Sequence, residues 1–274
     1  MPKLKAFISR FLFFFLFQYS WLSFDGISSA QQAPAHLTLT LDKLVQVTEI
    51  TADHQLILAD GTTVKLAGLL LPTQQDCGRL KVVCPLVERL SHYLQTILFN
   101  QQIYIASSPQ YFDRGDRLLA QVKNKEGNWV QKEILEQGLG RIITTTARPT
   151  DLVQMLYVEN QARQAQRGIW RLRAFQVLPT NNLNDKTDRF QIIEGTIKKT
   201  AEVRGTIYLN FGKDWRTDFT IKLEKNHRVA FANKGKDLLQ TAGHKVRIRG
   251  WLFWENGPMI SLYTPEQLEH LSIE

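Results

Sequence analysis

Charged side chains that could bind or cleave a phosphodiester form a first group in the middle of this chain of 274 residues. Asp113 and Arg117 stand four residues apart. A guanidinium can bind two phosphate oxygens at once. Asp113 and Arg117 could equally form a local ion pair that shapes a turn. The first group therefore allows phosphate chemistry without requiring it.

A second group of residues is basic and aromatic. Lys245, Arg247 and Arg249 alternate with aliphatic residues, which places the three cations on one face of a strand, and Trp251 follows them. Single-stranded nucleic acid favours such surfaces, because cations bind its phosphates and flat rings stack on its bases. We therefore predict that these four residues bind nucleic acid. The alternative is an amphipathic edge strand with its charged face in solvent.

The N-terminus has the pattern of a secretory signal peptide. Lys3, Lys5 and Arg10 precede an apolar stretch at residues 11–24, and small residues lead to Ala30. These 14 positions are fewer than the roughly 20 that span a bilayer. We expect a signal peptide over residues 1–30, cleavage after Ala30, no stable membrane anchor afterwards, and a periplasmic or secreted protein. An uncleaved anchor is the alternative.

Net charge and cysteine content agree with an exported protein that meets a polyanion. The formal charge of +8 becomes +6 once residues 1–30 are removed, which favours partners such as nucleic acid, anionic lipid or cell-surface polymer. The only cysteines are Cys77 and Cys84, and an oxidising compartment favours a disulfide between them over two free thiols. Pro85 suggests that a helix begins near Cys84, which leaves Cys77 in the preceding loop.

Several enzyme classes lack their signatures in this chain. The six histidines show no metal-ligand spacing, and two cysteines alone are too few for a zinc site. Neither a Gly-x-Ser-x-Gly elbow nor a phosphate-binding glycine loop is present. The sequence thus gives no support for a serine hydrolase or a P-loop nucleotidase.

Apolar patterns predict an α+β first domain over residues 40–172. Strands are predicted at residues 45–51, 55–59, 62–70, 103–106 and 118–122, and helices at residues 86–97, 130–137 and about 150–166. Asp60 and Gly61 form a strong hairpin signal between the second and third strands. This order predicts a barrel of the oligonucleotide/oligosaccharide-binding (OB) type with three flanking helices.

The remaining residues predict a second, smaller domain. Residues 173–188 gather turn formers and lose periodicity, so we expect a linker there. Strands are predicted at residues 190–197, 205–211, 218–223, 244–253 and 259–262, with a short helix at residues 236–241. Five strands in so short a stretch predict an all-β, OB-like domain over residues 189–274.

Six short motifs of the first domain, in order, resemble a staphylococcal nuclease-like (thermonuclease) domain. They are the Asp60-Gly61 hairpin, the run at residues 64–68 that leads to Pro72, the helix start at Pro85, residues 113–120, Gln137-Gly138-Leu139 and Gly168-Ile169-Trp170. The resemblance implies a bacterial exported member of that family with the barrel described above. In the second domain, residues 208–212 and 214–220 resemble a segment of domains appended to bacterial thermonuclease-like proteins.

The resemblance also implies a set of catalytic positions. The family cleaves phosphodiesters with a calcium ion on two acids and a carbonyl, a glutamate base and two arginines. Here Arg117 occupies one arginine position and Lys65 the other, while His54, Leu70, Leu71 and Thr73 occupy the positions of the calcium ligands and the base. Neither leucine side chain can bind calcium, which requires oxygen ligands.

These observations predict a nuclease-like protein with a degenerate calcium and base site. We expect it to bind nucleic acid or another polyanion through Arg117, Lys65 and the basic strand, and to need no cofactor. One alternative is an active phosphodiesterase that holds calcium on displaced acids, Asp53 or Asp76. Another is an envelope module that binds a protein partner.

Overall fold

The computed structural model describes residues 43–77, 84–146, 149–181, 183, 186–235 and 237–271. The predicted signal peptide lies outside these residues. Everything described belongs to one compact unit, Ala33–Glu274. In the described part of the chain, no helix has the length and hydrophobicity needed to cross a membrane.

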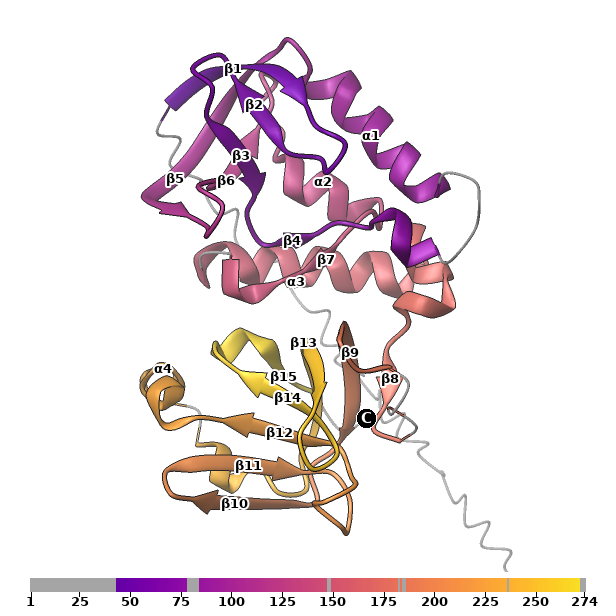
Figure 1. The fold of residues 1–274 in the computed structure, drawn as a ribbon, viewed down its shortest axis with the longest axis vertical. Helices are drawn as coiled ribbons and strands as arrows, with labels where there is room; N and C mark the ends of the chain where they lie inside the picture. The colour runs from indigo at the N-terminus through magenta and orange to yellow at the C-terminus, as the bar shows by residue number, and fades with distance from the viewer. Residues whose placement is uncertain are drawn as a thin grey trace, which may run out of the picture. The chain divides into compact units, whose positions relative to one another are not determined.

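The first half of the chain forms a closed barrel (Figure 1). Its strands are β1 (Lys43–Ile50), β2 (Leu56–Leu58), β3 (Thr63–Leu66), β5 (Gln102–Phe112) and β6 (Leu118–Lys123), in the order β1-β2-β3-β6-β5. All pairs are antiparallel except β3 with β6. Alternate residues such as Val47, Leu56 and Val64 are completely buried and fill the barrel. The predicted barrel is confirmed.

The three predicted helices are also confirmed: α1 (Pro85–Leu98), α2 (Val130–Glu136) and α3 (Pro149–Gln164). Helix α1 begins at Pro85 and buries Leu90, Leu94 and Leu98, whose spacing of four aligns them on one face. Each fully buried leucine contributes about 1.5–3 kcal/mol. The strand predicted at residues 62–70 is broken, because Gly68 has a φ of 78° and separates β3 from the short β4 (Leu69–Leu70).

Two glycines of the resemblance motifs bring the ends of α2 and α3 together. Ile169 donates a hydrogen bond to the carbonyl of Gly138 at 2.8 Å. A Cβ on Gly168 would lie 2.1 Å from that carbonyl oxygen, and one on Gly138 would lie 2.3 Å from the carbonyl oxygen of Arg167. Only glycine fits at either position. This contact fixes where the chain runs after α3, through the 3-10 turns η3 (Gly168–Arg171) and η4 (Arg173–Phe175).

The second half of the chain forms a larger sheet (Figure 1). Its main strands are β9 (Arg189–Thr196), β10 (Lys199–Val203), β11 (Thr206–Asn210), β12 (Thr220–Leu223), β13 (Lys245–Trp254) and β14 (Pro258–Leu262). Their order is β10-β11-β12-β14-β13-β9, with β12 and β14 parallel. If β9 and β10 are counted as two halves of one interrupted strand, the strands of this sheet follow the same order as those of the first barrel. The second β-domain predicted from sequence is therefore present.

Several elements of the second half escaped prediction. Strands β10 and β15 (Leu268–His270) were missed, as was helix α4 (Arg228–Asn233). The helix predicted at residues 236–241 is only the 3-10 turn η7 (Leu238–Gln240).

The segment predicted as a linker contains buried side chains and a short strand. Phe175 and Leu183 are almost completely buried. The short strand β8 (Leu178–Pro179) pairs in parallel with β9. The domain boundary at residues 173–188 stays a prediction. The turn-forming residues of this segment belong to a connection that is packed against the rest of the protein.

Candidate functional site

Asp113 holds Arg117 at the start of β6. The Nη2 atom of Arg117 lies 2.6 Å from Oδ2 of Asp113, and Nε donates to the same oxygen at 2.9 Å. Asp113 also accepts backbone N–H bonds from Gly115 and Arg117, at 2.9 and 3.2 Å. The Arg117 guanidinium, with these backbone bonds, lowers the pKa of Asp113 to about 2. The local ion pair is thus formed, and it occupies two of the nitrogens of Arg117.

Lys65 and Asp53 lie near this ion pair. Lys65 of β3 pairs with Leu119 of β6, and Arg117 precedes Leu119 by two residues, so the two cations face the same side of the sheet. Asp53 is exposed, and its charge adds to that of Asp113 in raising the pKa of Arg117. The structure therefore gathers one carboxylate and two cations beside Asp113.

The positions that correspond to the calcium ligands of the family hold a buried histidine and two packed leucines. His54 is 5% exposed, and its Nε2 lies 2.9 Å from Oγ of Ser91 on α1. Burial lowers the pKa of His54, which favours its neutral ring. Leu70 and Leu71 pack against two of the hydrophobic clusters. None of these three side chains offers the oxygen that calcium requires.

Asp76, the other acid proposed as a substitute calcium ligand, stabilises a turn. Oδ2 of Asp76 accepts hydrogen bonds from the backbone nitrogen and Oγ1 of Thr73, at 2.8 and 2.9 Å. Across the part of the chain that the structure describes, no three His, Cys, Asp or Glu side chains are placed to share a metal ion. The residues present do not fit the calcium site that the resemblance implies.

The basic strand face predicted at residues 245–251 is not an open surface. Lys245 is exposed, and Trp251 is 54% exposed with its ring packed edge-on against Phe190. Arg247 is half-buried, and Arg249 is only 1% exposed. The prediction that Arg249 contacts nucleic acid is wrong, because burial keeps its guanidinium away from any surface ligand.

Arg249 instead joins the two halves of the protein. Its Nη2 lies 2.8 Å from Oε2 of Glu159 on α3 and 2.7 Å from Oε1 of Glu269 on β15. Burial lowers the pKa of Arg249, but the two carboxylates outweigh it and raise the pKa above its ordinary value. Arg247 similarly pairs with Glu194 and Glu269, at 2.5 and 3.2 Å. Both arginines thus have a structural role, in ion pairs within the protein.

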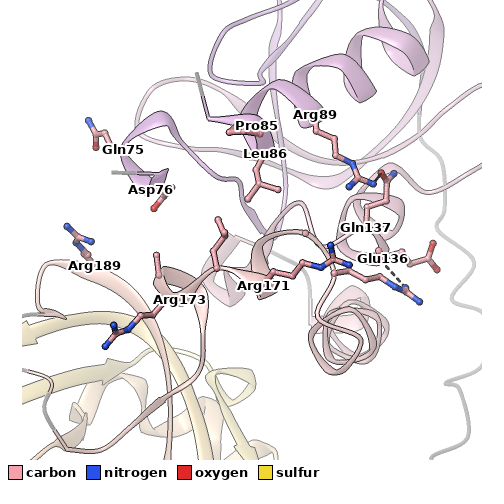
Figure 2. Close-up of a pocket in the computed structure, with 14 residues that line it drawn as sticks. Gln75, Asp76, Pro85, Leu86, Arg89, Glu136, Gln137, Arg171, Arg173 and Arg189 are labelled. Carbon is pink, nitrogen blue, oxygen red and sulfur yellow. Dashed lines mark hydrogen bonds between the residues drawn. The ribbon is translucent and has the colours of Figure 1, made fainter. Parts of the chain in front are cut away.

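The structure does gather exposed cations, at a place that the sequence analysis did not single out. A cavity of about 1170 Å³ lies between the start of α1, the end of α2 and the turns after α3. Five exposed arginines line it: Arg167, and Arg89, Arg171, Arg173 and Arg189, which are labelled in Figure 2. We call it the arginine cavity. Leu86 and Leu172 contribute apolar wall between the cations.

No ion pair involves these five arginines within the described residues. Arg167 donates to the carbonyl of Glu136 at 3.1 Å, Arg171 to the carbonyl of Gln166 at 2.9 Å, and Arg89 to Oε1 of Gln137 at 3.4 Å. These acceptors orient the guanidinium groups without neutralising them. The two acids that line the cavity have other partners: Glu136 pairs with Lys132, and Asp76 bonds to Thr73.

A weak signal for this cavity was present in the sequence. Arg167, Arg171 and Arg173 fall within seven residues, directly around the Gly168-Ile169-Trp170 motif. Arg89 and Arg189 come from distant segments, and only the fold brings them to the same cavity. The contact between Gly138 and Gly168 positions this turn against the end of α2.

Comparison with known proteins gives one family. Residues 63–172 match the family model described as staphylococcal nuclease homologue. The matched part includes three of the cavity arginines, while Arg173 and Arg189 lie beyond it. Comparison with curated proteins gave no match.

Proposed function

We propose that this chain, whose residues 63–172 form a staphylococcal nuclease-like domain, binds nucleic acid in the arginine cavity without cleaving it by the calcium mechanism. The observation that carries the proposal is the set of five exposed arginines around one cavity, none with a carboxylate partner among the described residues. The nuclease-like domain makes nucleic acid the expected polyanion.

The arginine cavity has the chemistry that a phosphate backbone requires. A guanidinium presents a planar fork of donors that matches two phosphate oxygens. Three arginines elsewhere, Arg117, Arg228 and Arg247, are neutralised by carboxylates within hydrogen-bond distance. The cavity arginines differ from these three in keeping their charge available. Uncompensated cations in a concave site attract an anionic polymer and raise its association rate.

Cleavage by the usual route is disfavoured by the residues themselves. Catalysis there would need acids around calcium and a carboxylate base, and this chain offers a buried His54, two packed leucines and Thr73. One observation favours a second candidate, an active phosphodiesterase. Asp53 is exposed and close enough to Arg117 to raise its pKa.

A single assay separates these two functions. Purified protein is mixed with labelled single-stranded DNA or RNA, with calcium or with a chelator. We expect retention of the oligonucleotide in both conditions and no shortened product. Calcium-dependent cleavage that disappears in Arg117→Ala would establish the phosphodiesterase instead, and Asp53→Asn would then test the displaced ligand. Absence of any binding at low salt would reject both candidates.

We also propose export and a Cys77–Cys84 disulfide. No cysteine among the described residues is free, although the Cys77 side chain lies outside them. The intact mass of the native-host protein should correspond to a chain that begins at Gln31 and lacks two hydrogens. Reduction should add these hydrogens back. A full-length mass, or thiols that react before reduction, would contradict the respective proposal.

A further inference from the structure

A second cavity lies on the face of the C-terminal sheet that points away from its core. It has a volume of about 530 Å³. Strand register sets Ala201, Tyr208 and Lys222 in one row across β10, β11 and β12. A neighbouring row contains Lys199 and Asn210. The intervening residues, such as Leu209, face the hydrophobic core.

A loop after β11 closes one side of this cavity with Trp215. Asp218 accepts a hydrogen bond from the backbone nitrogen of Asp214 at 2.8 Å, and Asp214 accepts one from that of Arg216 at 3.0 Å. Gly212 has to be glycine, because a Cβ there would lie 1.9 Å from the Asp218 carboxylate. This loop falls within the two segments, residues 208–212 and 214–220, whose role the sequence resemblance left open.

The loop presents an aromatic ring to solvent. Trp215 is 54% exposed although it lines a cavity, and the Arg216 guanidinium lies 5.0 Å from its ring centroid. Tyr208 adds a second ring to the lining. Several hydrogen bonds thus fix a loop whose tryptophan is not buried in the core. A rigid exposed ring provides a stacking surface for a flat ligand at low entropic cost.

The cations around this ring favour an anionic ligand. Lys199 and Lys213 line the cavity, are exposed, and form no ion pair with any described residue. The carboxylate at the rim, Glu255, is neutralised by Lys222 at 3.2 Å. Asn210 adds a polar group to the lining, where its Oδ1 accepts from Thr220 at 3.1 Å. A flat ring beside unpaired cations matches a base with its phosphate better than a neutral sugar.

We propose that this site, the Trp215 pocket, binds nucleotide units of a single-stranded nucleic acid, with a base stacked on Trp215 and phosphates near Lys199 and Lys213. The inference rests on the proposed function and adds to it a stacking site outside the nuclease-like domain. Its size lies within the range of about 300–1,000 Å³ typical of ligand pockets. Base stacking tolerates every sequence, because each base has an aromatic face.

The test compares Trp215→Ala with Trp254→Ala, a matched control. Trp254 is also 54% exposed but does not line the pocket. Fluorescence anisotropy measures the binding of an oligothymidine strand and of an abasic strand of equal length. Trp215→Ala should weaken oligothymidine binding by about tenfold to a hundredfold and leave the abasic strand unaffected. Trp254→Ala should change neither, and all variants should melt at similar temperatures.

Each alternative outcome has a distinct meaning. If wild type binds oligothymidine and Trp215→Ala binds it equally well, the Trp215 pocket is rejected while nucleic-acid binding stands. If Trp215→Ala weakens both strands equally, stacking is rejected. If wild type binds neither strand, the proposed function fails and the pocket inference fails with it. Should Trp215→Ala melt early, Lys199→Ala and Lys213→Ala replace it, and unchanged oligothymidine binding by both folded variants would reject the pocket.

Discussion

Arg249→Ala should destabilise the folded protein by about 3–5 kcal/mol, a cost typical of leaving a buried charge without its partner. The substitution leaves the buried carboxylate of Glu159, 2.8 Å from Arg249, without its ion-pair partner. Glu269 loses its contact with Arg249 at 2.7 Å and keeps only the one with Arg247 at 3.2 Å. The substitution also removes a bond between α3 and the second sheet. Urea unfolding at neutral pH, followed by circular dichroism, measures the loss.

The control for this prediction is Lys245→Ala on the same strand. Lys245 is exposed, so its removal should change the free energy of unfolding by about 0.5 kcal/mol or less. Equal stability of the Arg249→Ala and Lys245→Ala proteins would contradict the structural role assigned to Arg249. Separate unfolding transitions for the two halves in Arg249→Ala would show that this ion pair also couples them.

The pH dependence of the free energy of unfolding tests the same ion pair independently. Burial raises the pKa of Glu269, but the charge and hydrogen bond of Arg249, together with the charges of Arg247 and Arg163, outweigh burial and hold the pKa below its ordinary value of 4.5. A carboxylate with a depressed folded pKa stabilises the protein above its unfolded pKa, and this contribution is lost as the pH falls through the folded pKa. The difference in free energy of unfolding between wild type and Arg249→Ala should therefore become smaller below pH 4.5.

The first barrel was predictable because its signals are local and agree with one another. The spacing of Leu86, Leu90 and Leu94 predicts helix α1. Asp60-Gly61 predicts the hairpin between β2 and β3. The apolar pattern predicts a single strand that includes Gly68, but the positive φ of this glycine separates β3 from β4. A sequence pattern shows that glycine is present but not which conformation it adopts.

The candidate site was harder to predict, because charge pairing depends on the fold. Strand alternation correctly placed Arg247 and Arg249 on one face, but only the structure shows Glu159 and Glu194 opposite them. The basic face that looked like a ligand surface is therefore an ion-pair network. Conversely, no sequence pattern singles out Arg89, and only the fold brings it to the arginine cavity. The cations available to a ligand are those that the fold leaves without a carboxylate partner.

Arg171→Glu combined with Arg173→Glu should weaken binding of single-stranded nucleic acid by tenfold or more at low salt. Both side chains line the arginine cavity, and neither forms an ion pair with a described residue. For every phosphate that is no longer bound, the salt dependence should become shallower by about 0.7 units of log Kd per log salt concentration. Because both residues are exposed, the melting temperature should stay close to that of wild type. Anisotropy titrations over a series of salt concentrations measure affinity and slope together.

The matched control, Lys125→Glu combined with Lys234→Glu, changes the net charge by the same amount. Both lysines are exposed and paired with acids, Lys125 with Glu126 and Lys234 with Glu266. If long-range attraction to the whole basic protein governed binding, the two double variants would weaken it equally. A loss confined to Arg171→Glu/Arg173→Glu, with a reduced salt slope, requires direct binding of phosphates in the cavity. Equal losses would reject the cavity as the binding site, because the effect would then follow net charge and not position.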